Sequence, residues 1–195
     1  MRRGFKYIII GFLLILLDIH IIIDILPDPI GYLTILVGIG KLEFKEASTH
    51  PSSIVAAILL FYSIPTLVLD GQFFTQQIGL TQWWGIYSNV LSLLNVILVY
   101  FLFKIIKNIV KMLHSPELTL KTEQMYKWYM VVMLIVLFIQ PFLINMSGPP
   151  AIGFMLLVVA FALITQITFL FYLRTIQKQF THGSPGQGNL LNIEA

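Results

Sequence analysis

The chain has no cysteine and little charge. Lys, Arg, Asp and Glu together make up 11% of its 195 residues, whereas a soluble domain typically contains about 25%. Without cysteine, the chain cannot be a disulfide-stapled secreted scaffold, a thiolate enzyme or a lipid-anchored lipoprotein. With so little charge, it cannot present an ordinary water-facing surface. We therefore expect an integral membrane protein.

The motifs of common enzyme classes are also missing. The sequence contains no His-Glu-x-x-His zinc helix, no Gly-x-Ser-x-Gly nucleophile turn and no phosphate-binding Gly-rich loop with its Lys. We expect no enzymatic activity, no cofactor and no metal. The net charge of +3 does not indicate a nucleic-acid partner, because membrane proteins retain Lys and Arg on their cytoplasmic segments.

Long apolar runs take the place of these features. The chain is 57% hydrophobic, and crossing a hydrocarbon core of about 30 Å takes about 20 apolar residues. We predict an all-α transmembrane helical bundle in residues 1–174 and a disordered cytoplasmic tail in residues 175–195. The spans are predicted at about residues 7–26, 29–46, 54–69, 84–103, 128–145 and 151–173.

The segment at residues 29–46 decides the topology. Its apolar part is short enough to form a re-entrant loop. If it crosses fully, all twelve Lys and Arg residues lie on the side of the two termini, and the outer connections carry none. If it re-enters, the Lys-rich stretch from Lys104 to Lys127 moves outside. The positive-inside rule therefore favours six spans with both termini in the cytoplasm.

The first predicted span carries ionisable residues. Asp18 lies just past its middle, where an ionised carboxylate costs at least about 2.5 kcal/mol. His20 and Asp24 share a helix face and could exchange a proton. These three residues are a candidate intramembrane proton or ion site. Alternatively, Asp18 hydrogen-bonds a neighbouring helix, and His20 and Asp24 lie near the wet outer interface.

The second predicted span has a face of small residues, Gly31, Thr34 and Gly38, which allows another backbone to approach closely. Packing against the first span is the natural use of this face. The turn between the two spans reads Asp24-x-Leu26-Pro27-Asp28-x-x-Gly31-Tyr32. This stretch resembles small uncharacterised multi-span membrane proteins of Gram-positive bacteria. The resemblance covers about the first quarter of the chain and implies a bacterial plasma-membrane protein, without implying a mechanism.

A polar stripe runs along the fourth predicted span. A stripe of this kind faces protein or water rather than lipid, so it either bonds neighbouring helices or lines a polar cavity. The residues of the stripe are Ser88, Asn89, Ser92 and Asn95. Polar residues on the last two spans could complete such a cavity, namely Gln140, Asn145, Thr165, Gln166 and Thr168.

Lys104, Lys107 and Lys111 share one helical face after this span. They indicate contact with anionic lipid headgroups or with a cytoplasmic partner. Two functions fit these features. One is binding or transport of a small solute or ion, with Asp18 titrating. The alternative is a non-enzymatic accessory or regulatory subunit of a larger membrane complex. The partners are then the bilayer and a membrane protein or a second copy of the chain.

Overall fold

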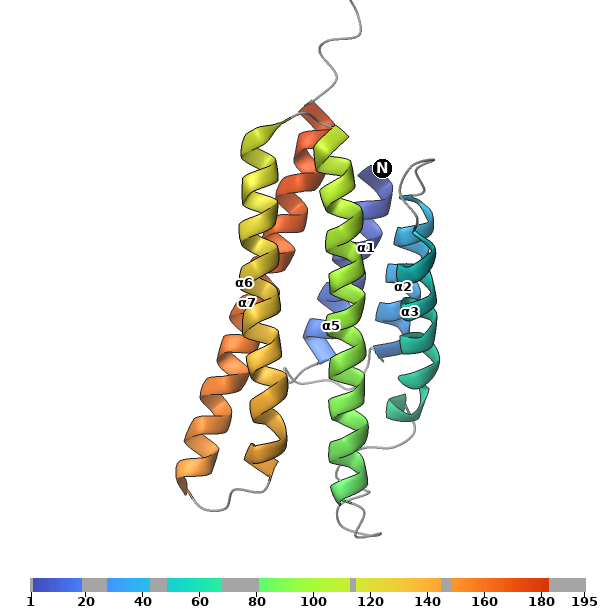
Figure 1. The fold of residues 1–195 in the computed structure, drawn as a ribbon. Coiled ribbons are helices and arrows are strands. Elements are labelled where there is room, and N and C mark those ends of the chain that lie inside the picture. Colours follow the sequence, from blue (N-terminus) through green and yellow to red (C-terminus); the bar gives the residue numbers. More distant parts are fainter. Residues whose placement is uncertain are drawn as a thin grey trace, which may run out of the picture.

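The computed structural model describes residues 2–18, 28–42, 49–67, 81–112, 115–144 and 149–182, and every regular element in these ranges is a helix (Figure 1). The predicted all-α class is confirmed for this part of the chain. The elements are α1 (Arg2–Asp18), α2 (Asp28–Gly40), α3 (His50–Tyr62), the short 3₁₀ helix η1 (Ile64–Leu67), α5 (Thr81–Met112), α6 (Pro116–Ile144) and α7 (Pro149–His182).

Three stretches are long and apolar enough to cross a membrane, which indicates a membrane protein. They are Gly85–Met112 in α5, Pro116–Phe142 in α6 and Gly153–Gln179 in α7, and they overlap the last three predicted spans. The first three helices are shorter. At 1.5 Å per residue, the 13 residues of α2 extend about 20 Å, less than a hydrocarbon core of about 30 Å.

Several helix boundaries differ from the predicted ones. α2 ends at Gly40, and Lys41 and Leu42 form a turn, so the helix does not continue to residue 46. α6 begins at Pro116, twelve residues before the predicted span, and α7 continues to His182. The predicted disordered tail is therefore wrong for residues 175–182, and residues 183–195 lie outside the described part of the chain. Hydropathy locates the apolar part of a helix and does not detect its polar extensions.

The six α-helices form a ring in chain order. Each helix packs against the next one, and α7 packs against α1. Neighbouring helices run in alternating directions (Figure 1). The ring consequently gathers the beginnings of α1, α3 and α6 and the ends of α2, α5 and α7 at one end of the bundle.

This end is rich in basic residues, and we call it the basic end. Two contacts connect its helices: the Gln177 side-chain amide donates to the Arg2 carbonyl at 3.2 Å, and the Lys41 ammonium lies 3.7 Å from the centre of the Tyr7 ring. The basic residues of the described helices lie in the halves nearest this end, at Arg2, Arg3, Lys6, Lys41, Lys104, Lys107, Lys111, Lys121, Lys127, Arg174 and Lys178.

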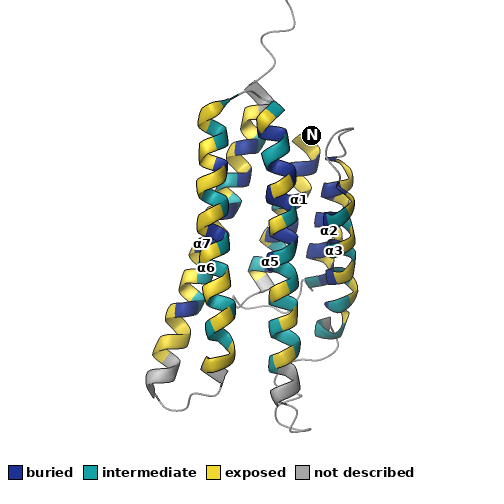
Figure 2. Cartoon of the chain, in the orientation of Figure 1, coloured by how far each residue is buried: buried dark blue, intermediate teal, exposed yellow. Residues whose placement is uncertain are grey.

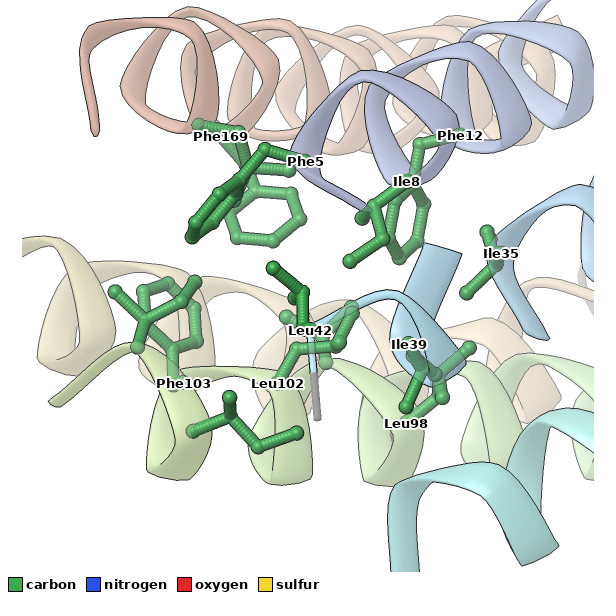
Figure 3. Close-up of a cluster of buried hydrophobic side chains, with 14 of the residues drawn as sticks. Phe5, Ile8, Phe12, Ile35, Ile39, Leu42, Leu98, Leu102, Phe103 and Phe169 are labelled. Carbon is green, nitrogen blue, oxygen red and sulfur yellow. The ribbon is translucent and has the colours of Figure 1, made fainter. Parts of the chain in front are cut away.

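Buried residues face the inside of the ring and exposed residues face its outside (Figure 2). Many residues on both sides are apolar. On α6, the outward-facing Trp128, Leu134 and Phe138 are 56%, 50% and 71% exposed. A bundle surrounded by lipid has no need for a polar outer face. All six α-helices of the described chain contribute to the core. Phe12 of α1 and Phe169 of α7 are among its fully buried members (Figure 3).

Glycines set the close packing of α1 against α2. A Cβ atom placed on Gly11 would lie 2.6 Å from the carbonyl oxygen of Gly31, and one placed on Gly38 would lie 3.0 Å from that of Gly4. The two pairs repeat at seven-residue spacing on both helices, so the antiparallel backbones touch twice in one register. Thr34 takes a different role, since its hydroxyl donates to the Ile30 carbonyl of its own helix at 2.7 Å.

Candidate functional site

A cavity of about 310 Å³ lies between α5, α6 and α7, with one residue of α1 at its wall. Its volume is at the small end of the range typical of ligand pockets, about 300–1,000 Å³. The lining is mostly aliphatic or Met side chains. It consists of Ile15, Ser92, Asn95, Met133, Val136, Leu137, Gln140, Met155, Val158, Val159, Ala162, Leu163 and Gln166.

Residue size explains why the cavity forms there. α5 and α7 are not neighbours in the ring, so side chains must fill the space between them. Toward the basic end, large rings do so: Phe103 of α5 and Phe169 of α7 lie 5.2 Å apart between ring centres. Two turns further from that end, the facing positions hold the smaller Asn95 and Ala162, and the space stays open.

Aromatic side chains close the cavity toward the basic end. Phe12, Phe103, Tyr129 and Phe169 are each 0% exposed, and we call this group the aromatic floor. The Phe169 ring lies 5.1 Å from the Tyr129 ring and 5.4 Å from the Phe12 ring. A dense ring cluster of this kind fills the space between the helices on that side of the cavity.

The lining becomes more exposed away from the floor. Along α7, Gln166 is 7% exposed, Val158 is 8% exposed and Met155 is 57% exposed. α7 runs toward the basic end, so Met155 lies at the opposite side of the cavity. The most exposed of these α7 residues therefore lies on the side of the cavity away from the basic end.

Four neutral polar residues supply the hydrogen-bonding groups of the lining: Ser92, Asn95, Gln140 and Gln166. The Tyr129 hydroxyl donates to Oε1 of Gln166 at 2.8 Å, which fixes the orientation of this amide. Gln166 lies within the apolar stretch Gly153–Gln179 of α7, and Tyr129 follows the charged first turns of α6.

Asn95 contributes an unpaired acceptor. Its side-chain oxygen Oδ1 is buried and has no hydrogen-bond partner among the described residues. An unpaired buried carbonyl of this kind costs about 1–3 kcal/mol. A ligand that donates a hydrogen bond to this oxygen would recover that cost.

The predicted polar stripe is divided by the structure. Ser92 and Asn95 line the cavity, whereas Ser88 and Asn89 do not. Asn89 also has a buried, unpaired Oδ1 within the described part of the chain. The structure thus brings two of the four stripe residues to one site.

The polar residues of the last two predicted spans are divided in the same way. Gln140 and Gln166 line the cavity. The hydroxyls of Thr165 and Thr168 donate to the carbonyls of Phe161 and Ile164 in their own helix, at 2.8 and 2.7 Å. Asn145 lies outside the described residues.

The candidate proton or ion site lies at the end of α1 and beyond it. Asp18 is the last residue of this helix, and its side chain is not described; His20 and Asp24 lie outside the described residues. The backbone of Asp18 is three residues beyond the cavity-lining Ile15, which is about one helical turn further from the basic end.

The three lysines of α5 lie near the basic end, away from the cavity. Lys104 and Lys111 are exposed, while Lys107 is partly buried and its ammonium lies 4.1 Å from the centre of the Tyr126 ring on α6. Such a cation–π contact contributes about 0.5–1 kcal/mol at an exposed site. Because Lys107 contacts Tyr126, Lys104 and Lys111 are the two lysines of this face of α5 whose side chains are exposed.

The contributions of Tyr129 and of the glycines of α1 could not be read from a single segment. Tyr129 was not among the predicted site residues, because its hydrogen bond to Gln166 connects α6 with α7. Gly4 and Gly11 had a readable signal, because their spacing equals that of Gly31 and Gly38. Among the described residues, no three His, Asp or Glu side chains gather as a metal site requires.

No protein-family model matches this chain, and no curated protein and no solved structure matches it either.

Proposed function

We propose that this chain is a plasma-membrane protein of six spans, with both termini in the cytoplasm, that binds small solutes in its cavity and carries them across the bilayer. The alternating ring of helices supports this topology, because α1 begins and α7 ends at the same end of the bundle (Figure 1), and the basic residues lie toward that end. By the positive-inside rule, that end faces the cytoplasm. The cavity then faces outward.

The observation that carries the proposal is the cavity itself. Neutral polar side chains from three helices line one cavity in a bundle whose outer surface is largely apolar. Polar groups are expensive inside a membrane and are usually retained for a function. An outward-facing cavity closed by the aromatic floor corresponds to one state of an alternating-access carrier, in which release to the cytoplasm requires the floor to open.

Asp18 is the proposed titratable group of this site. Its backbone lies one helical turn past Ile15 of the cavity wall, at a depth where a charged carboxylate is costly. Proton uptake by this carboxyl would couple to solute binding. His20 and Asp24, which follow it toward the outer side, would supply the path by which the proton reaches it.

A flux experiment tests the proposal. The purified protein is reconstituted into liposomes, and the rate of light-scattering change is recorded on mixing with glycerol, acetamide, acetate or methylammonium. We expect at least one solute to enter faster than in protein-free vesicles. Asp18→Asn should abolish the increase while the protein keeps its elution volume in detergent.

A matched pair of variants links the flux to the cavity. Ala162→Trp fills the lining, and Ala160→Trp adds the same bulk to an exposed position two residues away on α7. We expect only the first to block flux. Equal flux in the wild type, Ala162→Trp and Ala160→Trp would contradict the proposal. So would wild-type rates that equal those of empty vesicles for every solute. Undiminished flux in Asp18→Asn would remove the proposed role of that residue.

The exposed lysines support a second candidate function, that of an accessory subunit. Lys104 and Lys111 are exposed near the basic end, where a cytoplasmic or membrane-protein partner would dock. Neutralising Lys104, Lys107 and Lys111 to Gln should then remove a stoichiometric partner from the complex isolated in mild detergent. Isolation of the chain alone, or unchanged co-purification, counts against this role.

A further inference from the structure

The hydrogen-bonding groups at the deep end of the cavity differ in kind. Asn95 offers an acceptor, since its Oδ1 is buried without a partner among the described residues. Gln166 also lines the cavity, and because its Oε1 already accepts from the Tyr129 hydroxyl, its amide N–H groups are what it can offer to a ligand. A ligand that pairs with both residues must donate one hydrogen bond and accept another.

Charge narrows the ligand further. All the lining side chains are neutral, so an ionised ligand would enter without a counter-charge from this lining, at a large desolvation cost. A carboxylate accepts hydrogen bonds without donating, and an ammonium donates without accepting. Hydroxyl and primary amide groups do both and carry no charge.

The rest of the wall is apolar. Val136, Leu137, Val158 and Leu163 are among the residues that line it, and they would bury a short hydrocarbon tail favourably. We infer that the cavity binds an uncharged amphiphile with a hydroxyl or amide head group at Asn95 and Gln166 and a short aliphatic tail along α6 and α7. This inference rests on the proposed function and names the solute class of that site.

The test uses the absence of cysteine from the chain. Ala162→Cys places one thiol on the cavity wall, and Ala160→Cys places one on the exposed face of the same helix. Both proteins are put in lipid nanodiscs, and the rate of maleimide labelling is measured with hexanamide, hexanoate or hexylammonium present at neutral pH. These probes share their chain length and differ in their head groups.

We expect hexanamide to slow labelling of Ala162→Cys in a saturable way, with hexanoate and hexylammonium requiring at least tenfold higher concentrations. None of the three should slow labelling of Ala160→Cys, which reports general effects of the probes on the bilayer. Stronger protection by either ionised probe would overturn the inferred ligand class. The proposed function would be unaffected by that result, because it is tested separately by the flux that Ala162→Trp blocks. Absence of protection by hexanamide also overturns the inference.

Two further variants in the Ala162→Cys background tie the protection to the named groups. Asn95→Leu removes the acceptor, and Tyr129→Phe removes only the hydroxyl that orients Gln166, keeping the ring in the aromatic floor. Each should raise the half-protecting concentration of hexanamide about tenfold, or about 1.4 kcal/mol. Tyr172→Phe is the control, because its hydroxyl donates to Thr122 away from the cavity. If Tyr129→Phe behaves like Tyr172→Phe, Gln166 is not held for the ligand and the inference fails.

Discussion

The contact between α1 and α2 makes a quantitative prediction about Gly11. A methyl group added there would lie 2.5 Å from Cγ1 of Ile35 and 2.6 Å from the carbonyl oxygen of Gly31. A rotamer change could move the Ile35 atom, but the carbonyl belongs to the backbone of α2. Gly11→Ala therefore forces the two helices apart.

Gly153 on α7 supplies the matched control, because a methyl group there meets nothing within 4 Å. Both positions lie inside helices, so both substitutions gain about 1 kcal/mol from the higher helix propensity of Ala. Overpacking a tight contact costs about 1–3 kcal/mol. The difference between the two variants cancels the propensity gain and leaves the overpacking cost of about 1–3 kcal/mol.

The measurement is equilibrium unfolding in mixed detergent micelles titrated with a denaturing detergent, followed by circular dichroism or tryptophan fluorescence. We expect Gly153→Ala to be at least as stable as the wild type and Gly11→Ala to be less stable than Gly153→Ala by the stated amount. If the free energies of unfolding of the two variants agree within about 0.5 kcal/mol, the close backbone contact at Gly11 is refuted.

Two other stability predictions follow from the packing and the charges. Phe103→Ala removes a buried ring that contacts four other aromatic rings, and it should lower the free energy of unfolding by about 3–5 kcal/mol in the same assay. Phe138→Ala, at a position that is 71% exposed, should lower it by less than about 1 kcal/mol. Equal losses would contradict the assignment of core and surface. Lys121→Gln breaks an ion pair with Glu117 at 2.6 Å between exposed side chains. Its effect on the free energy of unfolding should be small and should vanish in high salt; a large, salt-independent loss would show another role for Lys121.

The helical class and the three long apolar stretches could be predicted because hydrocarbon thickness imposes a length that sequence hydropathy reveals. The helix ends could not, because α6 and α7 extend as polar helices held by local contacts. One example is the Glu117–Lys121 pair in the first turns of α6. α2 is shorter than predicted, since it ends at Gly40 and Lys41 and Leu42 form a turn.

The candidate site was only partly readable for a different reason. Polar residues on apolar helices marked Asn95, Gln140 and Gln166 as candidates, but their convergence depends on the closure of the ring by α1 and α7. Threonines on the same helices were equally plausible candidates in the sequence. In the structure their hydroxyls donate to carbonyls of their own helix, as Thr165 does to Phe161. A hydrogen-bonding residue can be recognised in a sequence, whereas its partner is determined by the tertiary fold.

The most direct test of the account concerns access to the cavity from one side of the membrane. Ala162→Cys and Ala160→Cys are expressed in intact cells and treated from outside with a charged thiol reagent that does not cross membranes. The account predicts labelling of the cavity position Ala162→Cys and none of the lipid-facing Ala160→Cys. Three results would contradict an outward-facing cavity. They are equal labelling of the two positions, no labelling of Ala162→Cys, and labelling of Ala162→Cys only after the cytoplasmic face is opened to the reagent.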